Sequence, residues 1–190
     1  MQCRGTKATV QTFSDDQLIR LIRAGDKAAF GILYERYRVP LYRFCVRMIG
    51  DNDQAADAVH ETFLKLYHSA EDMNEPALVR VWLYRVARNE VLMALRREHR
   101  GVDSNTVWDS ETPQTILEQV ELSAALEASL QDLKPEYKDI LLLREMDGLS
   151  YSEIADVTGK SESSVKSRLF KARKALALAL APRLGERRTV

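Results

Sequence analysis

The chain has 190 residues, of which 45% are hydrophobic and 29% charged, so it can form one ordinary domain or two small ones and is not a disordered chain. The net charge is zero, which excludes a uniformly basic coat for nucleic acid and makes local charge clusters more informative than the total. The two cysteines, Cys3 and Cys45, lie far apart without CxxC spacing, which argues against a disulfide framework or a structural zinc site. Cys45 falls on an apolar helical face, where we expect a core role.

The beginning of the chain lacks the apolar segment of a secretory signal peptide. The longest apolar runs are far too short to span a bilayer. We therefore expect a soluble protein in the cytoplasm, where reduced cysteines are the rule.

Helical patterns fill the first half of the chain. Residues 1–13 show no period and are predicted to form a flexible N-terminus. Ser14 and Gln17 have the spacing of a capping box, which predicts a helix start. A second helix is expected from Asp26, with apolar residues at helical spacing as far as Met48. The segment "QAADAVHETFLKLYHS" predicts a third helix.

A long basic helix is predicted next, over "ALVRVWLYRVARNEVLMALRREHR". From Arg80 to Arg100 it contains six Arg and two Glu. Trp82 and Tyr84 have the character of side chains that stack on unpaired bases, and the arginines that of a track for a nucleic-acid backbone. The alternative is that the apolar side chains of this helix occupy ordinary core positions. A core position is favoured for Leu83, whereas for Trp82 the two interpretations are equally open.

The character of the chain then changes. Residues 101–133 contain seven Asp or Glu and no Lys or Arg, and the first part lacks a period. A helical pattern returns with Leu122, Leu126, Leu130 and Leu133. We therefore predict an all-α protein of two small helical domains joined by an acidic flexible linker, with boundaries at 14–100, 101–118 and 119–181 and a tail at 182–190.

The segment "YSEIADVTGKSESSVKSRLFKARKAL" predicts two short helices joined at Gly159. Val165, Leu169 and Ala172 form the inward stripe of the second helix. This is the helix-turn-helix pattern, in which the second helix enters the major groove. The alternative is a pair of amphipathic helices with a solvated charged face. The residues off the stripe are Ser163, Ser164, Lys166, Ser167, Arg168, Lys171 and Arg173.

Three segments together resemble a bacterial RNA polymerase sigma factor of the sigma-70 family: "DQAADAVHETFLKLY", "WLYRVARN" and "LLLREMDGLSYSEIADVTGKSESSVKSRLFKAR". The short length is similar to that of the extracytoplasmic-function (ECF, group IV) subfamily. The resemblance implies a sigma domain 2 over 14–100 and a sigma domain 4 over 119–181. It also implies that the protein starts transcription by directing core RNA polymerase to promoters.

The resemblance gives each segment a role. Its implied partners are core polymerase, through the β′ clamp helices and the β flap, promoter DNA, and an anti-sigma factor. Met73 stands where relatives carry an aromatic residue, which implies an unusual −10 preference. The implied core-binding residues are Asp57, His60, Glu61 and Lys65. The −10 element would be opened and read by Met73, Asn74, Arg80, Trp82, Tyr84, Arg85, Arg88, Asn89, Arg96 and Arg97. The −35 duplex would be read by Ser161, Ser163, Ser164, Lys166, Ser167, Arg168, Lys171 and Arg173.

Two other interpretations were weighed against this one. The segment "HETFL" lacks the second histidine of HExxH, so it does not predict a zinc enzyme. A stand-alone helix-turn-helix regulator with an N-terminal signalling domain explains 150–176 equally well, but leaves the basic segment around Arg85 and Arg88 without a role. We expect no catalytic residue, metal, cofactor or small-molecule substrate.

Overall fold

A computed structural model describes residues 13–70, 72–73, 78–98 and 117–185, and every regular element within these ranges is helical. The N-terminal domain contains α2 (Asp15–Arg23), α3 (Lys27–Ile49), α4 (Asn52–Ser69) and α5 (Val79–Glu98). The C-terminal domain contains α6 (Leu117–Gln131), α7 (Pro135–Leu141), a π-helical turn (Leu142–Met146), α8 (Tyr151–Thr158) and α9 (Glu162–Gly185). The all-α prediction is confirmed, while the expected linker lies almost entirely outside the described residues.

Local sequence signals account for most helix starts. Ser14 forms the predicted capping box with Gln17 at α2, and the Asp26 carboxylate accepts from two backbone amides at the start of α3. Helix α3 continues through Pro40. Helix α9 likewise passes through Pro182, so it extends beyond the expected domain boundary at 181.

The N-terminal domain is built around α3, which packs on α2, α4 and α5. Cys45 is fully buried on α3, as predicted, and burial raises the pKa of its thiol to about 12. A thiol with such a pKa stays protonated and unreactive at neutral pH.

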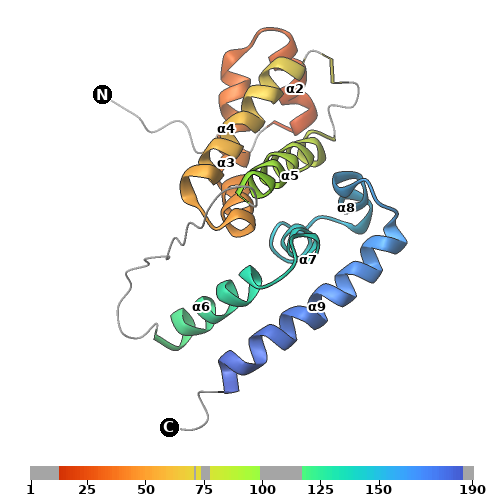
Figure 1. The fold of residues 1–190 in the computed structure, drawn as a ribbon. Helices are drawn as coiled ribbons and strands as arrows, with labels where there is room; N and C mark the ends of the chain where they lie inside the picture. Colours follow the sequence, from red (N-terminus) through yellow and green to blue (C-terminus); the bar gives the residue numbers. More distant parts are fainter. Residues whose placement is uncertain (1–12, 71, 74–77, 99–116, 186–190) are drawn as a thin grey trace.

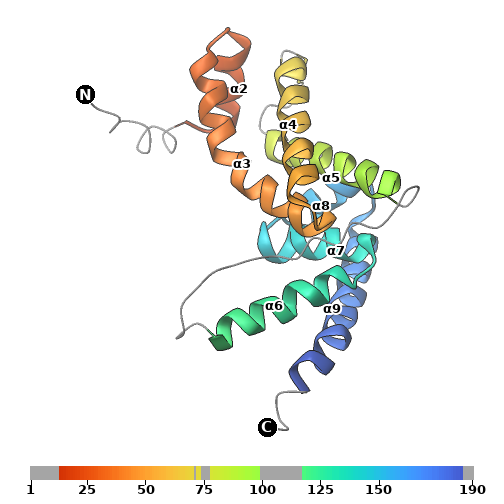
Figure 2. The ribbon, with the colours of Figure 1, turned by 60° about the vertical axis from the view of Figure 1, so that its left-hand side comes forward.

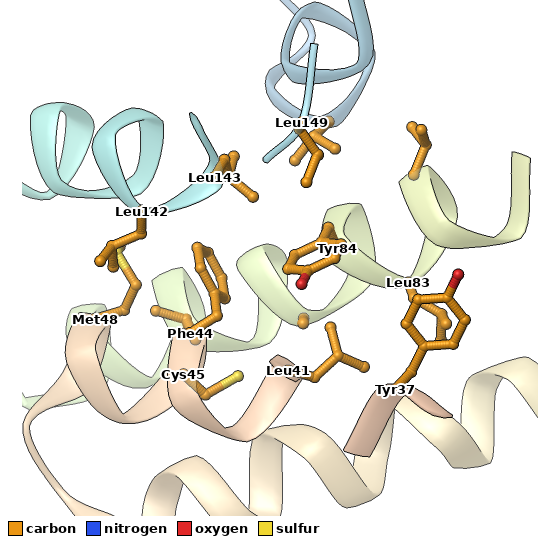
Figure 3. Packing of buried hydrophobic residues seen from close by; sticks show 14 of the residues in the cluster. Tyr37, Leu41, Phe44, Cys45, Met48, Leu83, Tyr84, Leu142, Leu143 and Leu149 are labelled. Atoms are coloured by element: carbon orange, nitrogen blue, oxygen red, sulfur yellow. The ribbon is translucent and has the colours of Figure 1, made fainter. Parts of the chain in front are cut away.

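The two domains lie against each other (Figures 1 and 2), with α8 and α7 beside α5 and α3. One continuous cluster of buried side chains runs through both domains. Figure 3 shows the centre of this interdomain interface, where Phe44 and Tyr84 face Leu142, Leu143 and Leu149. The rings of Phe44 and Tyr84 meet edge to face, with centroids 5.8 Å apart.

Candidate nucleic-acid and protein interfaces

Helices α8 and α9 form the predicted helix-turn-helix. Ser150 starts α8 through a capping box with Glu153. Gly159 ends it with φ of +66°, a left-handed conformation that a side chain would strain. The Ser161 hydroxyl accepts from the amide of Ser164 at the start of α9. Val165, Leu169 and Ala172 are buried, so the opposite side of α9 is turned outward.

The outward side of α9 carries the residues predicted to read duplex DNA. Ser164 and Arg168 are half-buried on this side. The cations have acidic neighbours: Arg168 lies 3.3 Å from Glu136, and Lys166 lies 3.9 Å from Glu162. Such exposed pairs are weak, so phosphates can replace the carboxylates. Arg173 donates two hydrogen bonds to the carboxylate of Glu145. The exposed residues on this side are Ser161, Ser163, Lys166, Ser167, Lys171 and Arg173.

Part of the basic side of α5, in contrast, is covered by the C-terminal domain, although Arg85 remains exposed. Arg88 Nε donates to a carboxylate oxygen of Asp139 over 2.7 Å. The side chains of Arg88 and Asp139 are only 14% and 1% exposed, so this is a buried ion pair. Burial raises the pKa of Asp139, and the charge of Arg88 opposes that rise.

Tyr84 lies in the middle of the same interface and is 2% exposed, so it is not available to stack on a base in this arrangement. Its hydroxyl donates to the Asp147 carboxylate over 2.7 Å. Burial raises the pKa of Asp147 to about 6, although Tyr84, Arg80 and Arg47 all act to lower it.

Two further arginines of α5 contact backbone oxygens of the C-terminal domain. Arg80 donates to the carbonyl of Asp147, and Arg85 Nε donates to that of Asp156 over 3.0 Å. Asn89, Arg96 and Arg97 are exposed.

A pocket of about 590 Å³ lies beside Trp82 and Met73. Trp82 is half-buried, while Met73 is buried. Asp156 and Arg85 complete the wall, so the C-terminal domain contributes to this pocket as well. Asn74 lies outside the described residues.

Helix α4 keeps its charged side free. Asp57, His60 and Glu61 are exposed, and Lys65 forms an ion pair with Glu90 of α5. His60 also borders a groove of about 200 Å³ between α3 and α4.

Sequence reasoning missed the α3 side of this groove, which Tyr34, Arg38 and Tyr42 line. Tyr34 lies at helical spacing with the apolar residues of α3, yet it is 39% exposed. An aromatic ring at helical spacing looks the same in sequence whether it fills a core or borders a groove.

Within the described ranges, no group of His, Cys, Asp or Glu is placed to hold a metal ion. No helix there is long and apolar enough to cross a membrane.

The matches to known protein families also divide the chain into two regions. The family description "Sigma-70 region 2" matches residues 33–101, and "Sigma-70, region 4" matches residues 123–176. The RNA polymerase sigma-H factor of Pseudomonas aeruginosa is 32% identical, over 90% of this chain and 96% of that protein. The ECF RNA polymerase sigma-E factor of Haemophilus influenzae is 30% identical, over 86% of this chain and 93% of the relative.

Two solved structures share the fold. CnrH in complex with the cytosolic domain of CnrY has a TM-score of 0.70 at 23% identity, over 88% of this chain and 97% of that one. The sigma factor RpoE of Bartonella quintana in complex with the anti-sigma factor NepR has a TM-score of 0.63 at 20% identity, over 78% of this chain and 96% of that one.

Proposed function

Because the chain belongs to the ECF group of the sigma-70 family, and is an RNA polymerase sigma factor that initiates transcription through promoter recognition, we propose that its two domains divide the promoter between them. The C-terminal domain reads the −35 element as duplex with α9. The N-terminal domain opens the −10 element and holds one strand on α5. The protein works on DNA in the cytoplasm and leaves nucleotide addition to the polymerase.

The observation that carries this assignment is the outward side of α9, where Lys166, Lys171 and Arg173 are exposed opposite a buried apolar stripe. A helix held in this way presents polar side chains to base edges and cations to phosphates.

For the −10 element, the pocket beside Trp82 is the candidate receptor for an unstacked base. Capture of a base in a pocket offsets an unstacking cost of a few kcal/mol. Met73 on its wall provides a thioether where relatives carry an aromatic ring, so we infer a −10 preference that differs from theirs.

Polymerase binding is assigned to α4. Asp57, His60 and Glu61 are exposed together with the neighbouring groove, and we propose that they meet the β′ clamp helices. The C-terminal domain would meet the β flap. The two solved relatives are bound to partners named CnrY and NepR, the second an anti-sigma factor, and we propose that such a factor holds this protein at rest.

Permanganate footprinting with purified core polymerase, on the DNA upstream of the protein's own coding region, tests this proposal. Thymines near −10 should become reactive only when core polymerase and this protein are both present. Protection of duplex by this protein alone, without melting, would contradict it and favour a stand-alone regulator.

A further inference from the structure

A pocket of about 250 Å³ lies at the seam between the two domains, and arginines form much of its wall. Arg43 and Arg47 of α3 and Arg80 of α5 line it, together with a single acidic residue, Asp147. The Asp147 carboxylate already accepts a hydrogen bond from the Tyr84 hydroxyl over 2.7 Å. Three guanidinium groups against one carboxylate leave the wall of this pocket with an excess of positive charge.

The three arginines also keep N–H donors for a ligand. Arg43 is exposed and forms no ion pair with any acidic residue that the structure describes. Arg47 uses its Nε for Glu127 over 2.8 Å, and Arg80 donates to a backbone carbonyl and lies 3.8 Å from Glu153. Because a guanidinium group carries five N–H donors, these contacts leave donors on each arginine for a further acceptor.

The charged part of the pocket is suited to a phosphate group. Arg43 and Arg47 lie one helical turn apart on α3, so their like charges repel each other, and an anion bound between them would relieve this repulsion. Guanidinium groups bond two oxygens of a phosphate or carboxylate at a time. A phosphate monoester, with about two negative charges and three free oxygens, matches three arginines better than a carboxylate does.

The remainder of the wall is apolar and comes from both domains. Pro40 and Phe44 belong to α3, while Leu142 and Met146 belong to the π-helical turn of the C-terminal domain. Figure 3 shows Phe44 beside Leu142. Segments of π-helix are rare and frequently lie at functional sites. The volume is below the range of about 300–1,000 Å³ that is usual for ligand pockets, which restricts the ligand to a small molecule.

We propose that this pocket binds a small organic phosphate monoester, with its phosphate on Arg43, Arg47 and Arg80 and its short apolar part against Phe44 and Met146. A DNA strand is charged at every nucleotide and would leave the apolar end of the pocket unused. Because both domains supply walls, the ligand would bind only while they are in contact. The inference does not depend on the proposed promoter contacts, and it is tested without polymerase or promoter DNA.

The test is isothermal titration calorimetry of the full chain with phenyl phosphate, which joins a phosphate to an apolar ring. We expect one saturable site. Inorganic phosphate lacks the ring and phenol lacks the charge, so each should bind at least several-fold more weakly. Arg43→Ala should weaken the binding of phenyl phosphate about tenfold or more, because it removes charge-assisted hydrogen bonds. Arg43 is exposed, so its removal leaves the core intact.

The matched control is Arg20→Ala, which removes an exposed guanidinium group from α2, outside the pocket. It should bind phenyl phosphate as the parent does. Met146→Ser, at a position that is 52% exposed, tests the apolar wall. It should weaken the binding of phenyl phosphate several-fold and leave the binding of inorganic phosphate unchanged.

Three outcomes would overturn the proposal. The first is the absence of a saturable site, or equal affinities of Arg43→Ala and Arg20→Ala for phenyl phosphate. The second is equal affinity of the parent for phenyl phosphate and inorganic phosphate, which would exclude an organic ligand. The third is binding of oligothymidylate that depends on Arg43 without binding of phenyl phosphate, which would assign the arginines to a DNA strand.

Discussion

Helices α4 and α5 carry the two charged surfaces of the N-terminal domain, and these surfaces differ in their exposure to solvent. On α4, Asp57, His60 and Glu61 project into solvent beside an open groove. On α5, Tyr84 and Arg88 are covered by another domain. The free chain therefore presents the surface that we propose for polymerase and covers part of the surface that we propose for a single strand.

The largest effect is expected from a substitution on the exposed surface of α4. Glu61→Arg should weaken binding to core polymerase by roughly tenfold or more. It places a positive charge on a surface where a negative charge would complement the partner. Fluorescence titration with core polymerase measures the affinity. Asp16→Arg, a charge reversal on α2 that breaks only the pair with Arg20, is the control. Equal affinity of Glu61→Arg and the parent at physiological salt would remove Glu61 from the interface.

A smaller effect is expected on α9, whose surface is exposed like that of α4. Arg168→Ala should lower transcription from a −35-dependent promoter by about tenfold, within the range for one lost base or phosphate contact. Binding to core polymerase should be unchanged. Arg183→Ala, on the same helix but far from its N-terminal half, is the control and should support normal transcription. Loss of affinity for core polymerase in Arg168→Ala would show that Arg168 has a different role.

The covered surface should respond to pH. When the two domains are in contact, in the closed form, burial raises the pKa of the Asp147 carboxyl to about 6, above its ordinary 3.8. Protonation of Asp147 therefore favours the closed form as the pH falls through 6. Burial lowers the pKa of Lys138 from 10.5 to about 8, although Asp132 and Glu127 oppose this, so deprotonation favours closure as the pH rises above 8.

The closed form should therefore be least favoured between about pH 6 and about pH 8. Energy transfer between dyes attached to the two domains should be higher near pH 5 and near pH 9 than near pH 7, with the open-to-closed ratio changing by about threefold to tenfold. A monotonic dependence would mean that only one of the two groups is buried by closure.

The smallest effect is expected at the end of α3. Gln131→Ala removes the hydrogen bond to the carbonyl of Arg47 and the acceptor for Lys138, at a cost of about 1 kcal/mol. The open-to-closed ratio should rise by about fivefold. An equal ratio in Gln131→Ala and in the parent protein would assign closure to the α5 side alone.

Sequence reasoning was most successful where a signal is local. The capping residue Ser14, the turn at Gly159 and the buried Cys45 each depend on neighbours a few positions away. The exposure of Leu122 and Leu126 on α6 was missed, because periodicity identifies an apolar side without showing whether anything covers it.

The interdomain interface was beyond this kind of reasoning. Arg88 and Asp139 are 51 positions apart, and their pairing depends on how two domains meet. Helix α5 is also buried on two sides, since Leu83 and Ala87 as well as Tyr84 are covered, so it shows little of the one-sided pattern by which an interface is found. Its arginines were assigned to DNA on their chemistry and on the family resemblance, and the same chemistry suits carboxylates.

Helix α9 has a mechanical consequence. Its 24 residues run without a break from the start of the recognition segment to Gly185, a rigid rod about 36 Å long. Leu178, 67% exposed, lies on the half that points away from the recognition residues. A protein bound to that half would act on a lever arm. A small rotation there would be carried along the helix and would change the angle at which the proposed recognition end meets DNA.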